Sequence, residues 1–419
     1  MGFYSIDEKA MSSAYPNIER ELAFYQNRVQ GVIEGFQKRY GKEPRIFSAP
    51  GRTEIGGNHT DHQHGCVLAA AVDLDILGAA LPNGTKAIRV FSEGFHTVEV
   101  NIQDLSVREE EKNTSASLVR GIAAKMIEKG YPIEGFDLYA TSNVLKGSGL
   151  SSSAAFEVLL GTVMNELFCG GKISPVDIAT IGQYAENKYF GKMSGLMDQT
   201  ASAVGGIVSI DFHNKAPIVK KLDFEFKNSG YSLCIIDSGA DHADLSDQYS
   251  AIPLEMGQVA KELGAEVLRD IDPREFISKL GNIRKSVGDR AVFRALHFYR
   301  ENQRAIDEAK RLAQGDFLGF LSLVNESGLS SLMYLQNVSV EGSVKNQEVL
   351  YALMACDILL DGRGAFRVHG GGFAGTVQAF VPNEMLMEFK NGIEAMVGEG
   401  SCHVLSIRMA GGIELTREG

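Results

Sequence analysis

A loop rich in glycine and serine, placed between a strand pattern and a helix pattern, constrains the fold of this chain most strongly. It reads VLKGSGLSSSAA over residues 144–155, with strand-like residues at 135–141 and an apolar-periodic helix expected at 152–169. Glycine lets backbone N–H groups approach an anion, serine donates further hydrogen bonds, and a helix N-terminus favours negative charge. The pattern therefore predicts a phosphate-binding turn; the alternative is a serine turn that only caps the helix.

This loop differs from the Walker A motif, because no lysine follows its second glycine as G-x-x-x-x-G-K-[ST] requires. The ordinary P-loop fold is therefore unsupported. Ser152 and Ser153 are candidates for holding a Mg²⁺ ion that accompanies a nucleotide. The residues expected to contact the nucleotide phosphates are Lys146, Gly147, Gly149, Leu150, Ser151, Ser152 and Ser153.

Length and composition indicate a globular protein with two domains. The chain has 419 residues, of which 44% are hydrophobic and 22% charged, close to ordinary globular values. Glycine is enriched, at 46 residues, and much of it is clustered, as expected where backbone lies against a ligand. The formal net charge of −12, with no basic stretch to offset it, argues against binding to nucleic acid or to an anionic membrane surface.

Cysteine usage and the N-terminal segment indicate the compartment. The five cysteines are scattered without metal-binding spacing, which is typical of reduced thiols: Cys66, Cys169, Cys234, Cys356 and Cys402. The N-terminus has no signal-peptide pattern, and no later run is long enough to span a bilayer. We therefore expect a cytoplasmic protein, present as a monomer or weak homodimer.

The pattern of elements divides the chain near residue 212 into two α+β halves. In the first half the expected helices cover 17–40, 115–129, 152–169 and 176–190. The expected strands there cover 45–48, 67–81, 88–91, 135–141 and 206–211. The pattern then restarts with a strand at 232–237, several helices to about residue 356, a glycine cluster, a strand at 375–381 and a helix from 384. We expect domains at 1–212 and 213–419.

Three stretches resemble one kinase superfamily, that of galactokinase, homoserine kinase, mevalonate kinase and phosphomevalonate kinase (the GHMP kinases). GLSSSAA at 149–155 resembles its second motif, and VHGGGFAGTVQAF at 368–380 resembles its third. SAPGRTEIGGNHTDH at 48–62 resembles the signature A-P-G-R-V-N-L-I-G-E-H-T-D-Y of the galactokinase branch. The three stretches occur in the family's order over nearly the whole chain.

This resemblance implies a fold and an activity. The fold is a two-domain α+β GHMP kinase, with an N-terminal domain like ribosomal protein S5 domain 2 and a ferredoxin-like C-terminal domain. The activity is transfer of the γ-phosphoryl group of ATP, with Mg²⁺, to the anomeric hydroxyl of a small sugar. ATP and sugar are expected to meet between the domains, and galactose is the first candidate sugar.

The resemblance also assigns roles to residues. Arg52 and Asp198 are the expected catalytic pair, in which Asp198 is a base or an electrostatic partner for the sugar hydroxyl and Arg52 lowers its pKa. Glu186 is expected to hold Mg²⁺ with a loop serine. Gly371 and Gly372 would return backbone to the phosphates, or else form a simple hairpin. The expected sugar contacts are Asn58, His59, Asp61, Asp198 and Tyr249, although Tyr249 also suits packing on a helix face.

Within the first signature, four of the departures from the family change the character of the side chain. The family's asparagine is Glu54, its isoleucine is Gly56, its glutamate is Asn58 and its tyrosine is His62. Because a neutral amide also donates hydrogen bonds, Asn58 is expected to alter the choice of sugar hydroxyl. The second hypothesis is therefore a kinase for another hexose or an N-acetyl amino sugar, and the third is a sensor that binds sugar and ATP without turnover.

Overall fold

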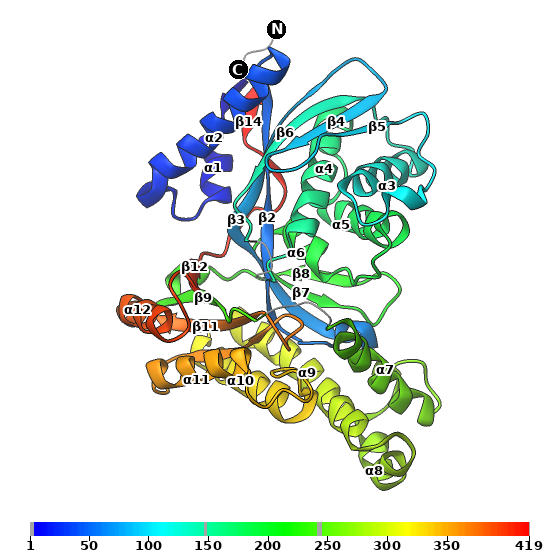
Figure 1. Cartoon of the computed structure of the whole chain (residues 1–419), viewed down its shortest axis with the longest axis vertical. Coiled ribbons are helices and arrows are strands. Elements are labelled where there is room, and N and C mark those ends of the chain that lie inside the picture. The colour runs from blue at the N-terminus through cyan, green and yellow to red at the C-terminus, as the bar shows by residue number, and fades with distance from the viewer. Residues whose placement is uncertain (1–3, 146–148, 241–244, 419) are drawn as a thin grey trace.

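The computed structural model describes residues 4–145, 149–240 and 245–418, and most of its strands lie in two sheets (Figure 1). The larger sheet has the order β13-β2-β3-β6-β4-β5, with β7 paired to β3 and β8 paired to β7. Only the β4–β6 pair is parallel among the described pairs of this sheet. Its strands are β2 (Arg45–Gly56), β3 (Cys66–Pro82), β4 (Ala87–Ser92), β5 (Val98–Asn101), β6 (Phe136–Ser142), β7 (Ile207–Asp211), β8 (Ile218–Lys221) and β13 (Ile413–Glu414).

Both faces of this sheet are covered by helices, as the alternation along β3 requires. Leu77 and Ala79 pack with the N-terminal helices, whereas Ile76 and Ala80 point to the opposite face and the main core. The first face carries α1 (Glu8–Ala14) and α2 (Ile18–Tyr40). The opposite face carries α3 (Ser115–Glu128), α4 (Ser152–Phe168), α5 (Pro175–Ala185) and α6 (Met197–Val204).

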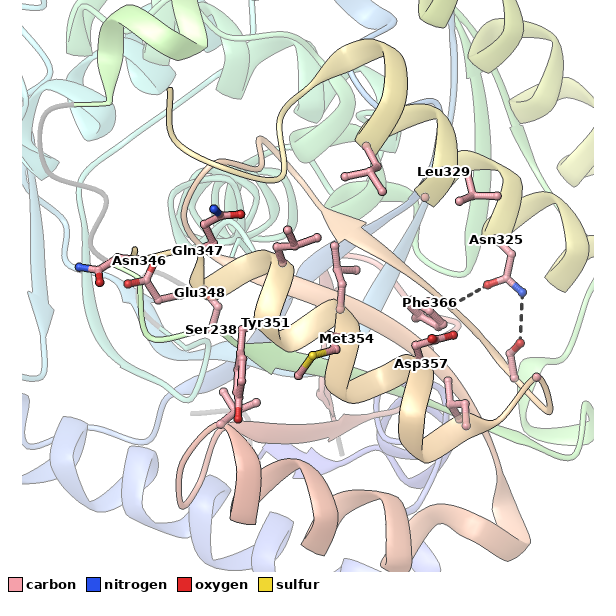
Figure 2. Close-up of a pocket in the computed structure, with 18 of the residues that line it drawn as sticks. Ser238, Asn325, Leu329, Asn346, Gln347, Glu348, Tyr351, Met354, Asp357 and Phe366 are labelled. Atoms are coloured by element: carbon pink, nitrogen blue, oxygen red, sulfur yellow. Dashed lines mark hydrogen bonds between the residues drawn. The ribbon is translucent and has the colours of Figure 1, made fainter. Parts of the chain in front are cut away.

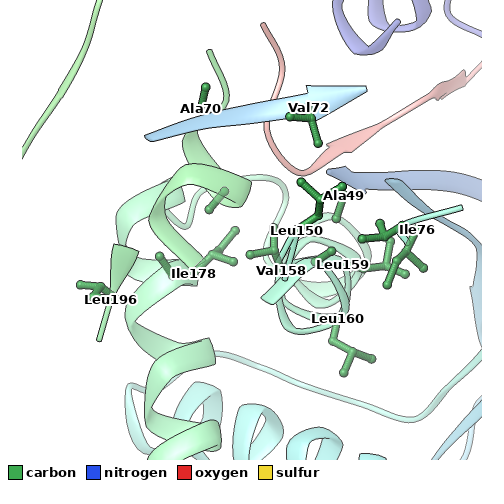
Figure 3. Packing of buried hydrophobic residues seen from close by; sticks show 14 of the residues in the cluster. Ala49, Ala70, Val72, Ile76, Leu150, Val158, Leu159, Leu160, Ile178 and Leu196 are labelled. Carbon is green, nitrogen blue, oxygen red and sulfur yellow. The ribbon is translucent and has the colours of Figure 1, made fainter. Parts of the chain in front are cut away.

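The main core anchors the glycine- and serine-rich loop. Leu150 is fully buried and packs among side chains of α4 and of the sheet, including Ala49, Ile76 and Leu159 (Figure 3). Burying a leucine contributes about 1.5–3 kcal/mol. The loop is therefore tied to the core at its centre, directly before helix α4 begins.

The second sheet is antiparallel, in the order β10-β11-β9-β12. One face packs against α11 (Glu348–Leu360) and α12 (Leu386–Met396), and residues such as Leu233 and Phe380 join the main core. Its strands are β9 (Tyr231–Asp237), β10 (Ala365–His369), β11 (Thr376–Pro382) and β12 (Cys402–Leu405). The remaining helices are α7 (Ser246–Glu262), α8 (Pro273–Val287), α9 (Asp289–Ala313) and α10 (Phe317–Ser330), with π-helical turns at Glu186–Phe190 and Ser331–Leu335.

The end of the chain returns to the N-terminal half. Strand β13 pairs with β2, and β14 (Thr416–Glu418) pairs with β1 (Tyr4–Ile6), so that the two termini lie side by side (Figure 1). Strand β8 also belongs to the first sheet. These pairings show which segments each sheet contains. The domain boundary between residues 212 and 213 stays a proposal.

The α+β class and the main elements expected from the sequence are confirmed. The four helices predicted before residue 212 are present as α2, α3, α4 and α5 with its π turn, and the predicted strands correspond to β2, β3, β4, β6, β7, β9 and β11. Strands β1, β5, β8, β10, β12, β13 and β14 lie outside the prediction. In the described part of the chain, no helix has both the length and the apolar character to cross a membrane.

Candidate active site

Arg52 and Asp198 form a bidentate ion pair. Arg52 lies in β2 beside a shift in the β2–β3 register, and Asp198 lies in the first turn of α6. Arg52 Nε is 2.7 Å from Asp198 Oδ1, and Nη2 is 2.6 Å from Oδ2. The expectation that these residues lie side by side is confirmed. Because the Asp198 side chain is still 28% exposed, a ligand can reach its carboxylate.

The environment of Asp198 keeps its carboxyl group ionised. Burial by itself raises the pKa of Asp198, but the charge and the hydrogen bonds of Arg52, and a hydrogen bond from Ser151, outweigh it and lower the pKa below the usual value. The Ser151 hydroxyl donates to Asp198 Oδ2 at 2.7 Å. Asp198 is therefore a carboxylate at neutral pH, in a state to accept hydrogen bonds.

The same pair is joined to the glycine- and serine-rich loop. Arg52 Nη1 donates to the carbonyl of Gly149, and the Arg52 backbone N–H donates to the carbonyl of Leu150 at 3.0 Å. Ser151 precedes α4 in the left-handed conformation, with φ of 55°, and makes no side-chain cap bond to the described helix. The capping alternative is therefore wrong for Ser151, whose hydroxyl is turned to Asp198. Lys146 and Gly147 lie outside the described residues.

A cavity of about 530 Å³ lies against the start of α4. Ser152 and Ser153 line it on one side, and aromatic rings line it elsewhere, among them Phe95, Phe156 and Phe190. A cavity of this size, lined by apolar rings and a few hydroxyl groups, has the character of a small-molecule site.

The segment after β2 meets the C-terminal glycine turn. His59, with φ of 57°, places Nε2 3.0 Å from the carbonyl of Gly371, and the Tyr249 hydroxyl donates to the carbonyl of Gly372 at 3.0 Å. Asp61 lies against Gly195, where an added Cβ would be 2.5 Å from Asp61 Oδ2. The structure thus brings His59 and Tyr249 to one turn, and Asp61 close to the segment that leads to Asp198.

Asn58 is completely buried, in contrast to its neighbour His59. Its amide nitrogen donates to Glu54 Oε1 at 2.9 Å and to the carbonyl of Gly370 at 2.6 Å. Its amide oxygen accepts from Asn337 Nδ2 at 3.0 Å and from the Ser331 hydroxyl at 3.4 Å. Both amide protons and the amide oxygen are therefore used by the protein, an arrangement that does not favour direct contact between Asn58 and a sugar hydroxyl.

Glu186 lies at the start of a π-helical turn, in a buried polar cluster. Its carboxylate accepts from Ser194 Oγ at 2.5 Å, Gln199 Nε2 at 2.9 Å and Lys192 Nζ at 3.2 Å. Gln199 also bonds Glu157, whose pKa is raised well above its usual value by burial and by the nearby Glu186. One carboxyl oxygen of Glu157, Oε1, is buried without a hydrogen-bond partner.

The chemistry of these groups fits Mg²⁺, which takes oxygen ligands and is commonly held by one or two carboxylates together with substrate phosphates. Glu186 supplies a carboxylate, and Ser152 and Ser153 supply hydroxyls beside the cavity at α4. The Lys192 ammonium competes for the Glu186 carboxylate from a side chain that is 59% exposed. Within the described ranges, no three His, Cys, Asp or Glu residues form a ready-made metal cluster.

His369 is a residue of the third glycine motif that the sequence did not single out. Its Nε2 lies 3.0 Å from Thr53 Oγ1 and accepts the backbone N–H of Glu54 at 3.2 Å, while Nδ1 lies 2.9 Å from Thr376 Oγ1. A Cβ on Gly149 would be 3.3 Å from this ring. Burial lowers the pKa of His369 well below its usual value, so the ring is a neutral spacer between β2, β11 and the loop. Its place at the start of HGGG was the available signal.

A larger cavity, of about 1000 Å³, lies away from these residues (Figure 2). It lies between α10 and α11, with Leu329, Tyr351 and Met354 among its lining, and Asn325 bonds the backbone of Gly364 and Phe366 at one end. None of its described lining residues is one that the sequence predicted for catalysis or binding. Size therefore does not locate the candidate active site in this protein.

Comparisons with known proteins identify the family of this chain. The family described as "GHMP kinases N terminal domain" matches residues 117–206, and the "Galactokinase galactose-binding signature" matches residues 34–82. A galactokinase of Glaesserella parasuis is 30% identical over 356 residues, which cover 82% of this chain and 87% of the relative. A galactokinase of Actinobacillus pleuropneumoniae serotype 3 is 30% identical over 367 residues, covering 85% and 90%.

Solved structures support the same fold. Lactococcus lactis galactokinase in complex with galactose matches with a TM-score of 0.78 at 23% identity, covering 93% of this chain and all of that one. A mevalonate kinase matches with a TM-score of 0.61 at 15% identity, covering 86% and 98%. The glycine- and serine-rich loop, the Arg52–Asp198 pair and the length of the match to relatives lead to one assignment. The chain belongs to the galactokinase family of the GHMP kinases, and its fold is the two-domain fold of that superfamily.

Proposed function

We propose that this chain is a galactokinase, which transfers the γ-phosphoryl group of ATP to the anomeric hydroxyl of galactose. The observation that carries the proposal is the Arg52–Asp198 pair, which bonds the carbonyl of Gly149 and the hydroxyl of Ser151 and so faces the phosphate loop. His59, Asp61 and Tyr249 lie on the sugar side of our proposed site. Relatives named galactokinase over most of the chain support the choice of galactose.

Asp198 is proposed to receive or orient the proton of the attacking hydroxyl. Phosphoryl transfer passes through a loose transition state, so positioning and charge stabilisation supply most of the catalysis and a strong base is not required. A carboxylate whose pKa is lowered suits this role, because it stays ionised and holds the hydroxyl at a fixed place. Arg52 fixes the carboxylate and places positive charge beside the transferring phosphoryl group.

The nucleotide is proposed to bind at the start of α4. Backbone N–H groups around Ser151 to Ser153 would receive the phosphates, together with the undescribed Lys146 and Gly147, and the aromatic cavity beside them would take the base. Gly371 and Gly372 would bring further backbone to the phosphates from the C-terminal half of the chain. Glu186, Ser152 and Ser153 would hold Mg²⁺, which supplies charge neutralisation of the phosphates when bound. The cytoplasm is the compartment we propose, where ATP is supplied and the five free cysteines stay reduced.

A panel of sugars with ATP and Mg²⁺, assayed by release of ADP, tests the proposed function. We expect galactose to give the highest kcat/KM. A clear preference for another hexose or for an N-acetyl amino sugar would show that this sugar, and not galactose, is the substrate. Thermal shifts with sugar and ATP but no ADP from any sugar would identify a sensor and would reject the kinase.

Gly195→Ala is expected to weaken sugar binding selectively. The added Cβ would be 2.5 Å from Asp61 Oδ2, so the carboxylate has to move away from its place. We expect the KM for galactose to rise about tenfold, equivalent to about 1.4 kcal/mol, with little change in the KM for ATP. Gly281→Ala in α8 is the matched control, because a Cβ there meets nothing within 4 Å. Equal KM values for galactose in the two variants would remove Asp61 from the sugar site.

A further inference from the structure

A buried ion pair connects β2 to the C-terminal domain immediately before the sugar loop, residues 56–61. Arg367 of β10 donates through Nη2 to Glu54 Oε1, and their side chains are 1% and 7% exposed. The same Glu54 oxygen accepts from the Asn58 amide. Two buried charges contribute little net stability, because desolvation offsets their attraction. A role in fixing geometry is therefore the better account of this pair.

Asn58 transmits this constraint to both sides of the sugar site. It bonds the carbonyl of Gly370, while Asn337 Nδ2 bonds both Asn58 Oδ1 at 3.0 Å and the carbonyl of Gly371 at 3.2 Å. His59 and Tyr249 bond the carbonyls of Gly371 and Gly372 in the same turn. The buried amide thus sets the distance between the sugar loop and the glycine turn.

Helix α9 fixes the backbone of the loop. Glu301 Oε1 accepts the N–H groups of Gly57 at 3.2 Å and Asn58 at 3.3 Å, and His297 Nε2 lies 2.9 Å from the Asn58 carbonyl. Glu301 is fully buried and also accepts from Ser327 at 2.6 Å. Burial by itself raises the pKa of Glu301, but the charged or polar groups His297, Arg304, Arg367 and Ser327 lower it overall, so it stays a carboxylate.

We propose that Glu54, Arg367 and Glu301 are positioning residues for the sugar. They hold loop 56–61 and the 370–372 turn in register through Asn58, so that His59, Asp61 and Tyr249 meet the sugar with fixed geometry. None of the three touches the sugar. We call Glu54, Arg367 and Glu301, together with Asn58, the inter-domain lock. In this account Asn58 does not choose among the sugar hydroxyls, and that choice is made by the other residues of loop 56–61. The inference rests on the proposed function.

Glu54→Gln tests the lock, because it keeps the size of the side chain and removes the charge that pairs with Arg367. We expect the KM for galactose to rise about tenfold or more, with kcat and the KM for ATP each within about threefold of wild type. Arg367→Met breaks the pair from the other side and should act alike. In the double variant the effects should be less than additive, since one interaction is lost in all three proteins.

Amide hydrogen exchange of residues 56–61 gives a second readout that needs no activity. We expect faster exchange in Glu54→Gln. Asn337→Ala, which removes the bonds from Asn337 to Asn58 and to the carbonyl of Gly371 without changing a charge, should have the same effect and is the substitute if Glu54→Gln does not fold. The matched control is Arg294→Lys, since Arg294 is an arginine of α9 that is 2% exposed and bonds Glu255 and the Leu335 carbonyl. We expect it to lower Tm without changing loop exchange or the KM for galactose.

These results separate the lock from the proposed function. The lock is overturned if the Glu54 and Arg367 variants lower Tm as Arg294→Lys does while the sugar KM and the exchange of loop 56–61 stay at wild-type values. Additive effects in the double variant would also overturn it. A wild-type protein that turns over no galactose instead overturns the proposed function, and the exchange comparison still reports whether the pair holds the loop.

Discussion

Replacing Asp198 with alanine is expected to lower kcat by about 10²–10⁴-fold, the usual contribution of a positioned proton acceptor. The variant loses the carboxylate that is held by Arg52 and Ser151 and that faces the attacking hydroxyl in our proposal. It also leaves the Arg52 guanidinium without its partner. Steady-state assays of ADP release with galactose measure the effect.

ATP binding is the control for this variant. The nucleotide contacts proposed around Ser152 and the aromatic cavity do not include Asp198, so ATP should still shift the melting temperature of Asp198→Ala as it does in wild type. Near-normal turnover in a protein that binds ATP would show that the chemistry has been placed at the wrong residue.

Arg52→Gln is expected to lower kcat by about 10²–10³-fold, the range seen when one preorganised charge or donor at a transition state is removed. The wild-type side chain bonds Asp198 twice and the carbonyl of Gly149 once, so its loss loosens both the carboxylate and the phosphate loop. Arg52→Lys keeps the charge but not the bidentate geometry, and we expect its kcat to lie between those of wild type and Arg52→Gln.

The pH profile separates the effect of Arg52 on the pKa of Asp198 from its effect on the geometry of the site. In wild type the pKa of Asp198 in the folded protein is below 3.8, the ordinary pKa of an aspartate. The acid limb of kcat/KM that this group causes therefore lies below pH 3.8. Without the charge and the hydrogen bonds of Arg52, the effect of burial is countered less, by the hydrogen bond of Ser151 and the charge of Lys192. The pKa of Asp198 therefore rises, and the acid limb should move to higher pH in Arg52→Gln. Arg52→Lys is the matched control, with an acid limb closer to wild type. Profiles that coincide in all three proteins would contradict the assigned environment.

Local motifs made much of the fold and of the proposed catalytic centre predictable. The loop around Ser151 combines a strand, glycines and a helix start within a few residues, and Arg52 and Asp198 each lie in a short recognisable pattern. Their pairing across 146 positions followed from the family resemblance, and the structure confirms it.

The inter-domain lock had no such local signal. Of its residues, Glu301 lies at helical spacing from two other charged residues of the same helix, Arg304 and Glu308, a pattern that in a sequence is indistinguishable from a solvated charged face. They are buried because α9 packs against the loop after β2, and this contact exists only in the tertiary structure. Strand β10 was missed because its buried Arg367 and His369 break the apolar pattern of a core strand. The pairing of β13 and β14 with strands near the N-terminus is too short and too distant to show in a local pattern.

The position of the transferred phosphate tests the account most directly. We would follow galactose, ATP and Mg²⁺ with the wild-type protein by ³¹P nuclear magnetic resonance, and with Asp198→Ala as the paired sample. The account predicts one new phosphate ester on the anomeric oxygen, formed in step with ADP and lost in the variant. A phosphate on another sugar oxygen, or the same ester formed equally fast without Asp198, would contradict it.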